Sequence, residues 1–259
     1  MMNSKLTKYS TRVIVAVIVI SAVILFWYLL TIDQTSKERL LYPSPNMVIE
    51  AFVRQWDQII LYSFTTLYRV LVGLLVGGVL GIIFGASMTW SKRIYLIFDP
   101  IIEIIRPIPP IALTPFFILW FGLGDFGQIL LIALGSFMII TVSTFESIRN
   151  IPPVFARAAR SLGANELQLY YTIYLPAILP SLFAGLRVGL ATAFALTVAA
   201  EYLGAQGGLG YLMRNARVVL QTEVILLAAI LLGLLSLLMD RILRLLFGYL
   251  TRWTSKPIL

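Results

Sequence analysis

Apolar residues in this chain form long uninterrupted runs, and the polar residues gather in short segments between them. Four runs contain no charged residue, at positions 13–31, 70–90, 126–145 and 224–239. A helix of about 20 apolar residues crosses the hydrocarbon layer of a bilayer. A fifth run at 177–200 is interrupted only by Arg187, and a weaker sixth at 94–122 contains three charges and five prolines. The pattern predicts an all-α, polytopic membrane protein.

The charged residues between these runs fix the number of spans and their direction. The chain has 20 Lys and Arg against 12 Asp and Glu, a net charge of +8. With the N-terminus inside, the inner segments carry 12 basic and 5 acidic side chains, the outer segments carry 6 and 7, and Arg106 and Arg187 remain in the membrane. Because cytoplasmic loops carry the excess of Lys and Arg, the basic loops at 91–93 and 149–160 must both be inside. An even number of crossings must therefore separate them.

This parity makes the weak sixth run a span and gives a single transmembrane domain, residues 1–259, with both termini cytoplasmic. The first span is expected to be a retained anchor, because its apolar stretch is longer than that of a cleaved signal peptide. The six expected spans lie at about 13–32, 65–90, 94–122, 126–146, 178–201 and 223–247, with a cytoplasmic segment at 151–176.

The composition narrows the range of functions. Apolar residues make up 59% of the chain and charged residues 12%, against about 25% charged in a typical soluble domain. His and Cys are both absent, which excludes a thiol nucleophile, a Cys/His zinc site and a His general base. We therefore expect no catalytic residue and no metal site. The positive charge indicates membrane orientation and not the binding of nucleic acid.

The third expected span cannot be one regular helix. Its prolines free backbone carbonyls, and irregular backbone at membrane depth is tolerated where it is buried in protein or lines a water-filled path. Arg106, Pro107 and Pro109 lie at the break. Because an arginine in the membrane needs a partner or a cavity, Arg106 either clamps carbonyls or Glu103, or lines a path that attracts anions. These three residues are candidates for a translocation path.

Two charged residues on the fifth expected span are further candidates for this path. Arg187 and Glu201 are 14 residues apart, which places them within about 40° of the same helix face and roughly 21 Å apart along the axis. A second interpretation is that both side chains snorkel to the membrane surface or pair with charges on other helices. Either interpretation would explain charged residues at these positions. The glycine-rich loop after Glu201, which contains Gly208, would form a gate, a contact for a partner or a tight turn.

Glycines recur every four residues in the second expected span, at Gly73, Gly77, Gly81 and Gly85. Such a row lies along one helix face and lets a neighbouring backbone approach closely. The neighbour is either another helix of the same chain or a second copy across a dimer seam.

The segment 151–176 is too polar to span a membrane. Gly163 is expected to end a first helix in the left-handed conformation. Asn165 is expected to cap a second helix, with Gln168 three residues later as in a capping box. The resulting helix–turn–helix suits docking in a groove of another protein, and its composition also allows a helix at the membrane surface.

This segment carries a family resemblance as well. The pattern Ala158-Ala159-x3-Gly163-x9-Ile173-x-Leu175-Pro176 resembles the EAA loop of permease subunits in binding-protein-dependent ABC importers, with Arg157 in place of the usual first Glu. The nitrate, sulfonate, taurine and bicarbonate branch of that family is similar over most of the chain. The motifs that match are Pro-Ser-Pro at 43–45, Arg-Pro-Ile-Pro at 106–109, Leu-Trp-Phe-Gly-Leu-Gly at 119–124, Gly-Leu-Arg at 185–187, Ala-Ala-Glu at 199–201 and Gly-Leu-Gly at 208–210.

The resemblance implies the fold of a type I ABC importer permease and a set of partners. In that family two six-span permeases form the pore, two cytoplasmic ATPases bind ATP and Mg²⁺ and dock on the EAA helices, and an extracytoplasmic binding protein delivers the solute. It implies a homodimer with a second permease copy, surrounded by lipid in a bacterial cytoplasmic (inner) membrane, with no cofactor in this chain. The residues that would couple to the ATPase are Arg157, Ala158, Ala159, Leu162, Gly163, Ala164 and Asn165.

The sequence contains no Gly-x4-Gly-Lys-Ser/Thr phosphate loop, so energy for transport must come from a partner. The expected function is ATP-driven import, by alternating access, of a small anion such as a sulfonate, taurine, nitrate or bicarbonate, with Arg106 and Arg187 as the reason for an anion. One alternative is the same importer class for a neutral or heterocyclic nutrient. Another is a stand-alone secondary transporter, in which Glu103 or Glu201 would couple an ion. A membrane enzyme has little support.

Overall fold

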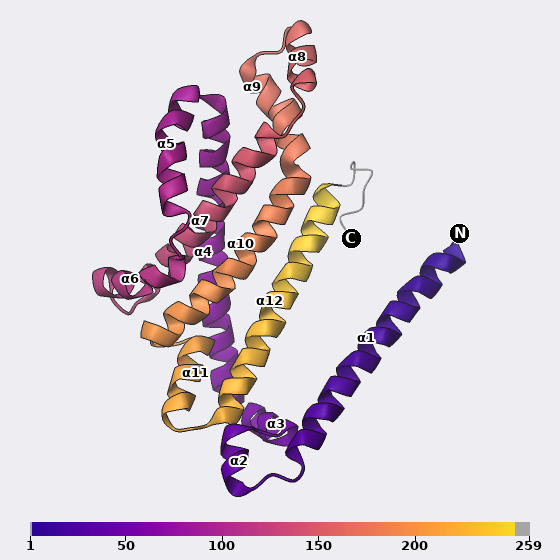
Figure 1. Ribbon diagram of the computed structural model, residues 1–259, viewed down its shortest axis with the longest axis vertical. Coiled ribbons are helices and arrows are strands. Elements are labelled where there is room, and N and C mark those ends of the chain that lie inside the picture. The colour runs from indigo at the N-terminus through magenta and orange to yellow at the C-terminus, as the bar shows by residue number, and fades with distance from the viewer. Residues whose placement is uncertain (1, 252–259) are drawn as a thin grey trace.

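The structure, a computed structural model, describes residues 2–251, and the regular structure within them is entirely helical (Figure 1). The expected all-α class is therefore confirmed. The α-helices are α1 (Met2–Thr31), α2 (Ser36–Leu41), α3 (Pro45–Arg54), α4 (Trp56–Trp90), α5 (Lys92–Ile105), α6 (Thr114–Phe121), α7 (Asp125–Arg149), α8 (Pro153–Ser161), α9 (Glu166–Leu169), α10 (Leu175–Gly204), α11 (Leu209–Val218) and α12 (Thr222–Leu250). A 3₁₀ turn, η1 (Pro110–Leu113), precedes α6, and a π turn, η2 (Tyr170–Tyr174), joins α9 to α10.

Length and apolarity make four helices of the described chain candidates for membrane spans. They are α4, α7, α12 and the continuous helix Glu166–Gly204, which comprises α9, η2 and α10. The helices Lys92–Ile105 and Pro110–Phe121 are separated by a bend of 81°. If the two together form one span, they make a fifth candidate. The apolar part of α1, Val17–Thr31, is a shorter apolar helix. The count of six spans stays a prediction.

The bend after α5 has a local cause in the sequence. The N–H of Ile108 donates to the carbonyl of Ile105 (2.9 Å) and closes a turn beyond the last residue of the helix. Pro107, Pro109 and Pro110 have no N–H to donate, so an α-helix cannot continue through them. Pro110 instead begins η1, at a position where the missing N–H costs little. The break expected from the prolines is confirmed at this position.

Helices α4, α7 and α10 pack against one another and form the centre of the bundle. The glycine row of α4 faces α7. A Cβ on Gly73 would come within 2.6 Å of Ile132 Cγ2, and one on Gly85 within 2.6 Å of the carbonyl oxygen of Thr141. The buried Ile140 of α7 contacts both neighbours, since a Cβ on Gly81 of α4 would lie 3.0 Å from its Cβ and one on Gly189 of α10 would lie 3.3 Å from its Cδ1. The row therefore lets two helices of one chain approach closely.

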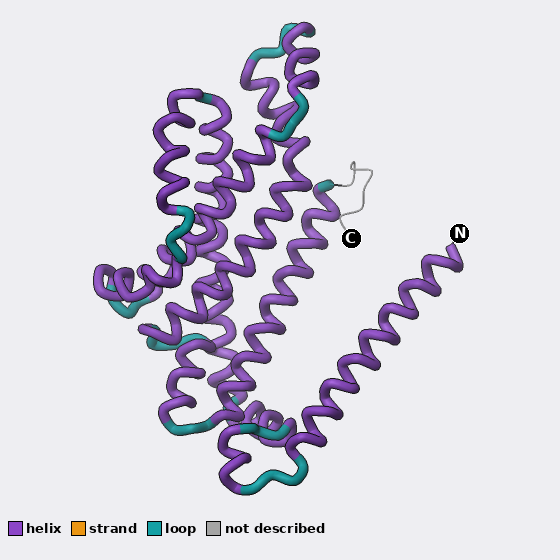
Figure 2. The backbone as a smooth tube through the Cα atoms, in the orientation of Figure 1, coloured by secondary structure: helices purple, strands orange, loops and turns teal. Residues whose placement is uncertain are grey.

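The two ends of the bundle differ. At one end α8 and α9 project beyond the other helices (Figure 1). At the opposite end α11 and α3 pack against the first turns of α12. These two ends are called the α8 end and the α11 end. Helix α1 diverges from α12. Its C-terminal part is hydrogen-bonded to the segment before α3, where Trp27 Nε1 donates to the carbonyl of Pro43 (3.1 Å). Figure 2 shows that loops are confined to the ends of helices and to the break after α5.

Candidate functional site: a cavity beside the helix break

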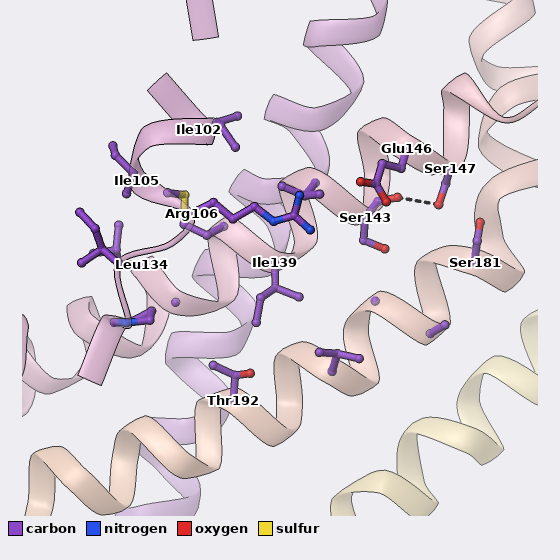
Figure 3. A pocket seen from close by; sticks show the side chains of 18 of the residues that line it. Ile102, Ile105, Arg106, Leu134, Ile139, Ser143, Glu146, Ser147, Ser181 and Thr192 are labelled. Carbon is purple, nitrogen blue, oxygen red and sulfur yellow. Dashed lines mark hydrogen bonds between the residues drawn. The ribbon is translucent and has the colours of Figure 1, made fainter. Parts of the chain in front are cut away.

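A cavity of about 830 Å³ lies between α5, η1, α7 and α10 (Figure 3). Pockets of this size with mainly apolar walls and a few convergent polar groups are usual for small ligands. The helix break creates it, because the turn after α5 carries the chain away from the path a straight helix would follow. The polar lining residues are Arg106, Ser143, Glu146, Ser147, Asn150, Ser181 and Thr192.

Arg106 supplies the positive charge among the residues that line this cavity. Its N–H donates to the carbonyl of Ile102 (2.8 Å) at the end of α5, and its side chain extends toward α7 (Figure 3). Within residues 2–251, no hydrogen bond or ion pair engages its guanidinium group, and Glu103 is not its partner. Of the two interpretations of Arg106, the geometry favours a charge that lines the cavity. Pro107 and Pro109 shape the turn without lining the cavity.

The hydroxyl groups of the cavity differ in what they can offer a ligand. Ser147 donates its proton to the carbonyl of Ser143 (2.6 Å), and Ser181 donates to the carbonyl of Ile178 (2.9 Å). Both can therefore only accept further hydrogen bonds. The hydroxyls of Ser143 and Thr192 have no such bond within the described chain and remain available as donors. Arg106, Ser143 and Thr192 could thus meet the oxygens of an anion, while the carboxylate of Glu146 opposes one.

Arg187 lies outside the lining of this cavity and has a partner of its own. Its guanidinium group pairs with Asp240 of α12 (Nη2 to Oδ2, 3.3 Å), and Arg244 binds the same carboxylate (2.8 Å). The ring of Phe183 lies 5.8 Å from the guanidinium carbon. This geometry matches the interpretation that Arg187 pairs between helices, and its role in the path stays a prediction.

Glu201 is fully buried at the α11 end, and its carboxylate accepts hydrogen bonds from three groups. Arg69 Nη1 lies 2.8 Å from Oε1, the Thr66 hydroxyl 3.0 Å from either oxygen, and the N–H of Gly210 2.9 Å from Oε2. Arg69, only 3% exposed, also donates to the carbonyl of Gly207 (2.7 Å) and to Asp125 Oδ1 (2.9 Å from Nε). The carboxylate therefore joins α4, α10 and the start of α11.

The glycine-rich loop after α10 is a tight turn around this carboxylate. Gly208 has φ +105°, and a Cβ there would come within 2.5 Å of Glu201 Oε2. A Cβ on Gly210 would lie 2.7 Å from the carbonyl oxygen of Val198. Of the three interpretations of the loop, a gate, a partner contact and a tight turn, the geometry matches the last. The assignment of Glu201 and Gly208 to the path stays a prediction.

The segment 151–176 has the helix–turn–helix form that the sequence predicted. Gly163 has φ +86°, and the N–H of Ala164 donates to the carbonyl of Ala159 (3.0 Å), which closes α8. Asn165 Oδ1 accepts from the N–H of Gln168 (2.8 Å), and Gln168 Oε1 accepts from the N–H of Asn165 (2.8 Å). The expected capping box is confirmed.

This turn is braced and it presents exposed side chains. Arg160 donates to Glu166 (2.9 Å), and this hydrogen bond raises the pKa of the arginine above its usual value. Leu162, at 89%, is almost fully exposed, and Arg157 and Ala158 are exposed as well. Because η2 runs without a break into α10, the segment is continuous with a long helix.

Sequence reasoning missed the partners of the buried charges. The six expected spans place Arg69 and Asp125 among the outer charges and Asp240 among the inner ones. In the structure each of them forms an ion pair between helices. Arg69 directly precedes an uncharged run of 21 residues. An arginine at the edge of such a run is a signal for a buried partner, but it does not say which acid the partner is.

Comparison with protein families gives one match that covers most of the chain. Residues 77–255 match the family described as binding-protein-dependent transport system inner membrane component. The taurine transport system permease protein TauC of Escherichia coli (strain K12) is 37% identical over 188 residues, which cover 73% of this chain and 68% of TauC. SsuC of Bacillus subtilis (strain 168), whose name places it in aliphatic sulfonates transport, is 37% identical over 190 residues, 73% of this chain and 69% of SsuC.

Solved structures give the same fold. A chain of the MetNI methionine ABC transporter in an inward-facing conformation superposes with a TM-score of 0.61 at 23% identity, covering 74% of this chain and 97% of that one. A chain of an amino acid ABC transporter with histidines gives 0.60 at 20% identity, covering 79% and 97%. The arrangement of helices is therefore that of ABC importer permeases.

Proposed function

The chain belongs to the family of binding-protein-dependent transport system inner membrane components, and from this premise we propose that it forms the solute path of an ATP-driven importer for a small organic anion. The observation that carries the proposal is Arg106, a cation without a partner in the described chain that lines a cavity of about 830 Å³. The names of TauC and SsuC make a sulfonate or taurine the first solute to test. A neutral or heterocyclic nutrient is the competing solute.

Energy would come from two cytoplasmic ATPase subunits that hold ATP and Mg²⁺. The α8–α9 segment supports this, because it presents Leu162 and Arg157 to solvent and is continuous with α10. A movement of α8 would therefore be transmitted to the helix that forms one wall of the cavity. In the proposed cycle, closure of the ATPase pair opens the cavity outward to receive solute from the binding protein, and separation of the pair opens the cavity to the cytoplasm. A second copy of the chain would supply the other half of the path.

The proposed orientation places the α8 end and both termini in the cytoplasm. The excess of basic residues in segments 91–93 and 149–160 supports this direction, because positive loops stay inside. In this arrangement α1 and the bent pair α5–α6 complete six spans.

The decisive experiment measures uptake by the chain reconstituted with its ATPase and binding protein. Replacement of Arg106 by Gln removes the charge, whereas Arg106→Lys keeps it. Loss of one charge–anion contact of about 1.5–3 kcal/mol predicts a roughly 10- to 150-fold lower rate of taurine uptake for Gln, with partial recovery for Lys. Arg54→Gln, which removes an exposed cation paired with Glu223 at the α11 end, is the matched control.

The two solute classes give different results in this assay. If uptake of an alkanesulfonate by the Gln variant equals that of the control, Arg106 does not select anions. If the binding protein holds only ligands without an anionic group, the anion proposal fails and the neutral nutrient replaces it. Uptake without any ATPase would instead indicate a stand-alone transporter.

A further inference from the structure

A second polar cavity lies at the α8 end, apart from the candidate path. It measures about 590 Å³ and lies between the end of α4, the start of α5, the end of α7, α8 and η2. No residue of the described part of the chain lines both cavities. A solute path through the first cavity therefore leaves the second one without a role, and its chemistry has to be explained separately.

Among the described residues, four basic side chains and no acidic one line this second cavity. Arg160 is paired with Glu166. Within residues 2–251, no ion pair or hydrogen bond engages the side-chain nitrogens of Lys92, Arg149 or Arg157. Like charges gathered around one concave space repel one another. An anion in that space would be attracted to each of them, and this attraction would offset the repulsion. The charge pattern therefore indicates a site for an anion.

The walls of the cavity are preformed. The Tyr170 hydroxyl and Thr89 Oγ1 are hydrogen-bonded at 2.7 Å, and the ring of Trp90 lies 4.7 Å from that of Tyr170. Tyr95 stacks on Phe145 with ring centroids 5.3 Å apart. Trp and Tyr at the ends of apolar helices are typical of the level of lipid head groups. A ligand at this level meets the cations without a rearrangement of the aromatic residues.

We propose that this cavity binds a phosphate-bearing anion, either the head group of an anionic phospholipid or a free phosphorylated solute. Arginine forks match the oxygens of phosphate, and basic pockets between helices at the cytoplasmic surface are suited to anionic head groups. Lys92 and Arg149 belong to α5 and the end of α7, whereas Arg157 belongs to α8. A bound phosphate would thus hold the α8–α9 segment to the bundle. The site rests on this cavity alone, and only its cytoplasmic location rests on the proposed function.

The test measures lipid binding to the full chain in detergent by native mass spectrometry, with phosphatidylglycerol and phosphatidylcholine as probes. Each basic residue near an anionic surface accounts for about a fivefold change in affinity. The double variant Lys92→Gln/Arg149→Gln should therefore bind phosphatidylglycerol about 25-fold more weakly, with phosphatidylcholine unaffected. Arg93→Gln/Arg241→Gln is the matched control, because it removes two exposed cations that do not line the cavity, and it should bind phosphatidylglycerol as the wild type does.

Competition with inorganic phosphate distinguishes the two sources of the anion. Displacement of phosphatidylglycerol by millimolar phosphate indicates a site for free phosphate-bearing solutes, and charge-dependent binding without displacement indicates a lipid head group. Both results support the site. Equal binding by the two double variants, with no competition by phosphate, overturns it. Lys92→Arg/Arg149→Lys should restore binding and so exclude misfolding as the cause. Loss of uptake in the Arg106 variants has no bearing on these results.

Discussion

Arg69 is the residue whose removal should most affect the stability of the α11 end. Replacement by Met keeps much of its length but removes the charge that faces Glu201, which is fully buried. The carboxylate loses a donor at 2.8 Å and keeps the Thr66 hydroxyl and the N–H of Gly210. A buried carboxylate without its counter-charge is costly, because the desolvation of the charge is no longer offset.

The size of the effect follows from these contacts. Breaking a buried ion pair by removal of one partner costs about 3–5 kcal/mol. The two donors that remain on Glu201 place the expected loss at the lower end, about 3 kcal/mol. For a chain of this size that loss lowers the midpoint of thermal unfolding by about 6–12 °C.

The assay is the thermal unfolding of the purified chain in detergent, followed by size exclusion of the heated samples. The double variant Arg69→Met/Glu201→Gln removes both charges and should recover at least about 1 kcal/mol of the loss. Arg54→Met is the control: its partner is Glu223 at 3.3 Å and its side chain is 60% exposed, so about 1 kcal/mol at most is expected.

Two results would refute this reasoning. If Arg69→Met unfolds within about a degree of Arg54→Met, the buried pair contributes no more than an exposed one. If the double variant unfolds as low as Arg69→Met, the loss comes from packing or from the bond to Asp125 and not from the uncompensated charge on Glu201.

Three further predictions concern single turns. Gly208→Ala should unfold well below Gly122→Ala, because both glycines have positive φ but only at Gly208 would the Cβ meet the Glu201 carboxylate; thermal unfolding of the two variants tests this. Gly163→Leu should lose ATPase co-purification and ATP-dependent uptake, whereas Gly163→Asn should keep both, because asparagine tolerates the left-handed conformation at φ +86°. Hydrogen bonds from the N–H and hydroxyl of Thr35 hold the pKa of Glu38 below its usual value. The stability that these bonds give to α2 is therefore present above the usual pKa of a carboxyl group and is lost as the pH falls through the lowered pKa of Glu38. In the variant Thr35→Ala, NMR titration should show a higher pKa for Glu38.

Local features of the fold could be predicted from the sequence because their causes are local. The prolines after position 106 break the helix wherever the segment lies, since a missing N–H cannot be supplied by a neighbour. Gly163, Asn165 and Gln168 form a turn and a capping box whose atoms all lie within six residues. The EAA resemblance belongs to the same segment. Apolar run lengths likewise predicted α7 and α12 closely, whereas α4 begins at Trp56, before the apolar segment starts.

The pairing of charges between helices was decided by the tertiary structure. Arg69 lies 132 residues from Glu201 and 56 from Asp125, and Arg187 lies 53 residues from Asp240. Residue spacing on one helix placed Arg187 and Glu201 near a common face, but it carries no information on what the neighbouring helices bring to that face. Packing of α4, α10 and α12 supplied a partner for each of them and, within residues 2–251, left Arg106 without one. A charge in a membrane is stable only with a partner or a cavity, and which of the two it has depends on helix packing.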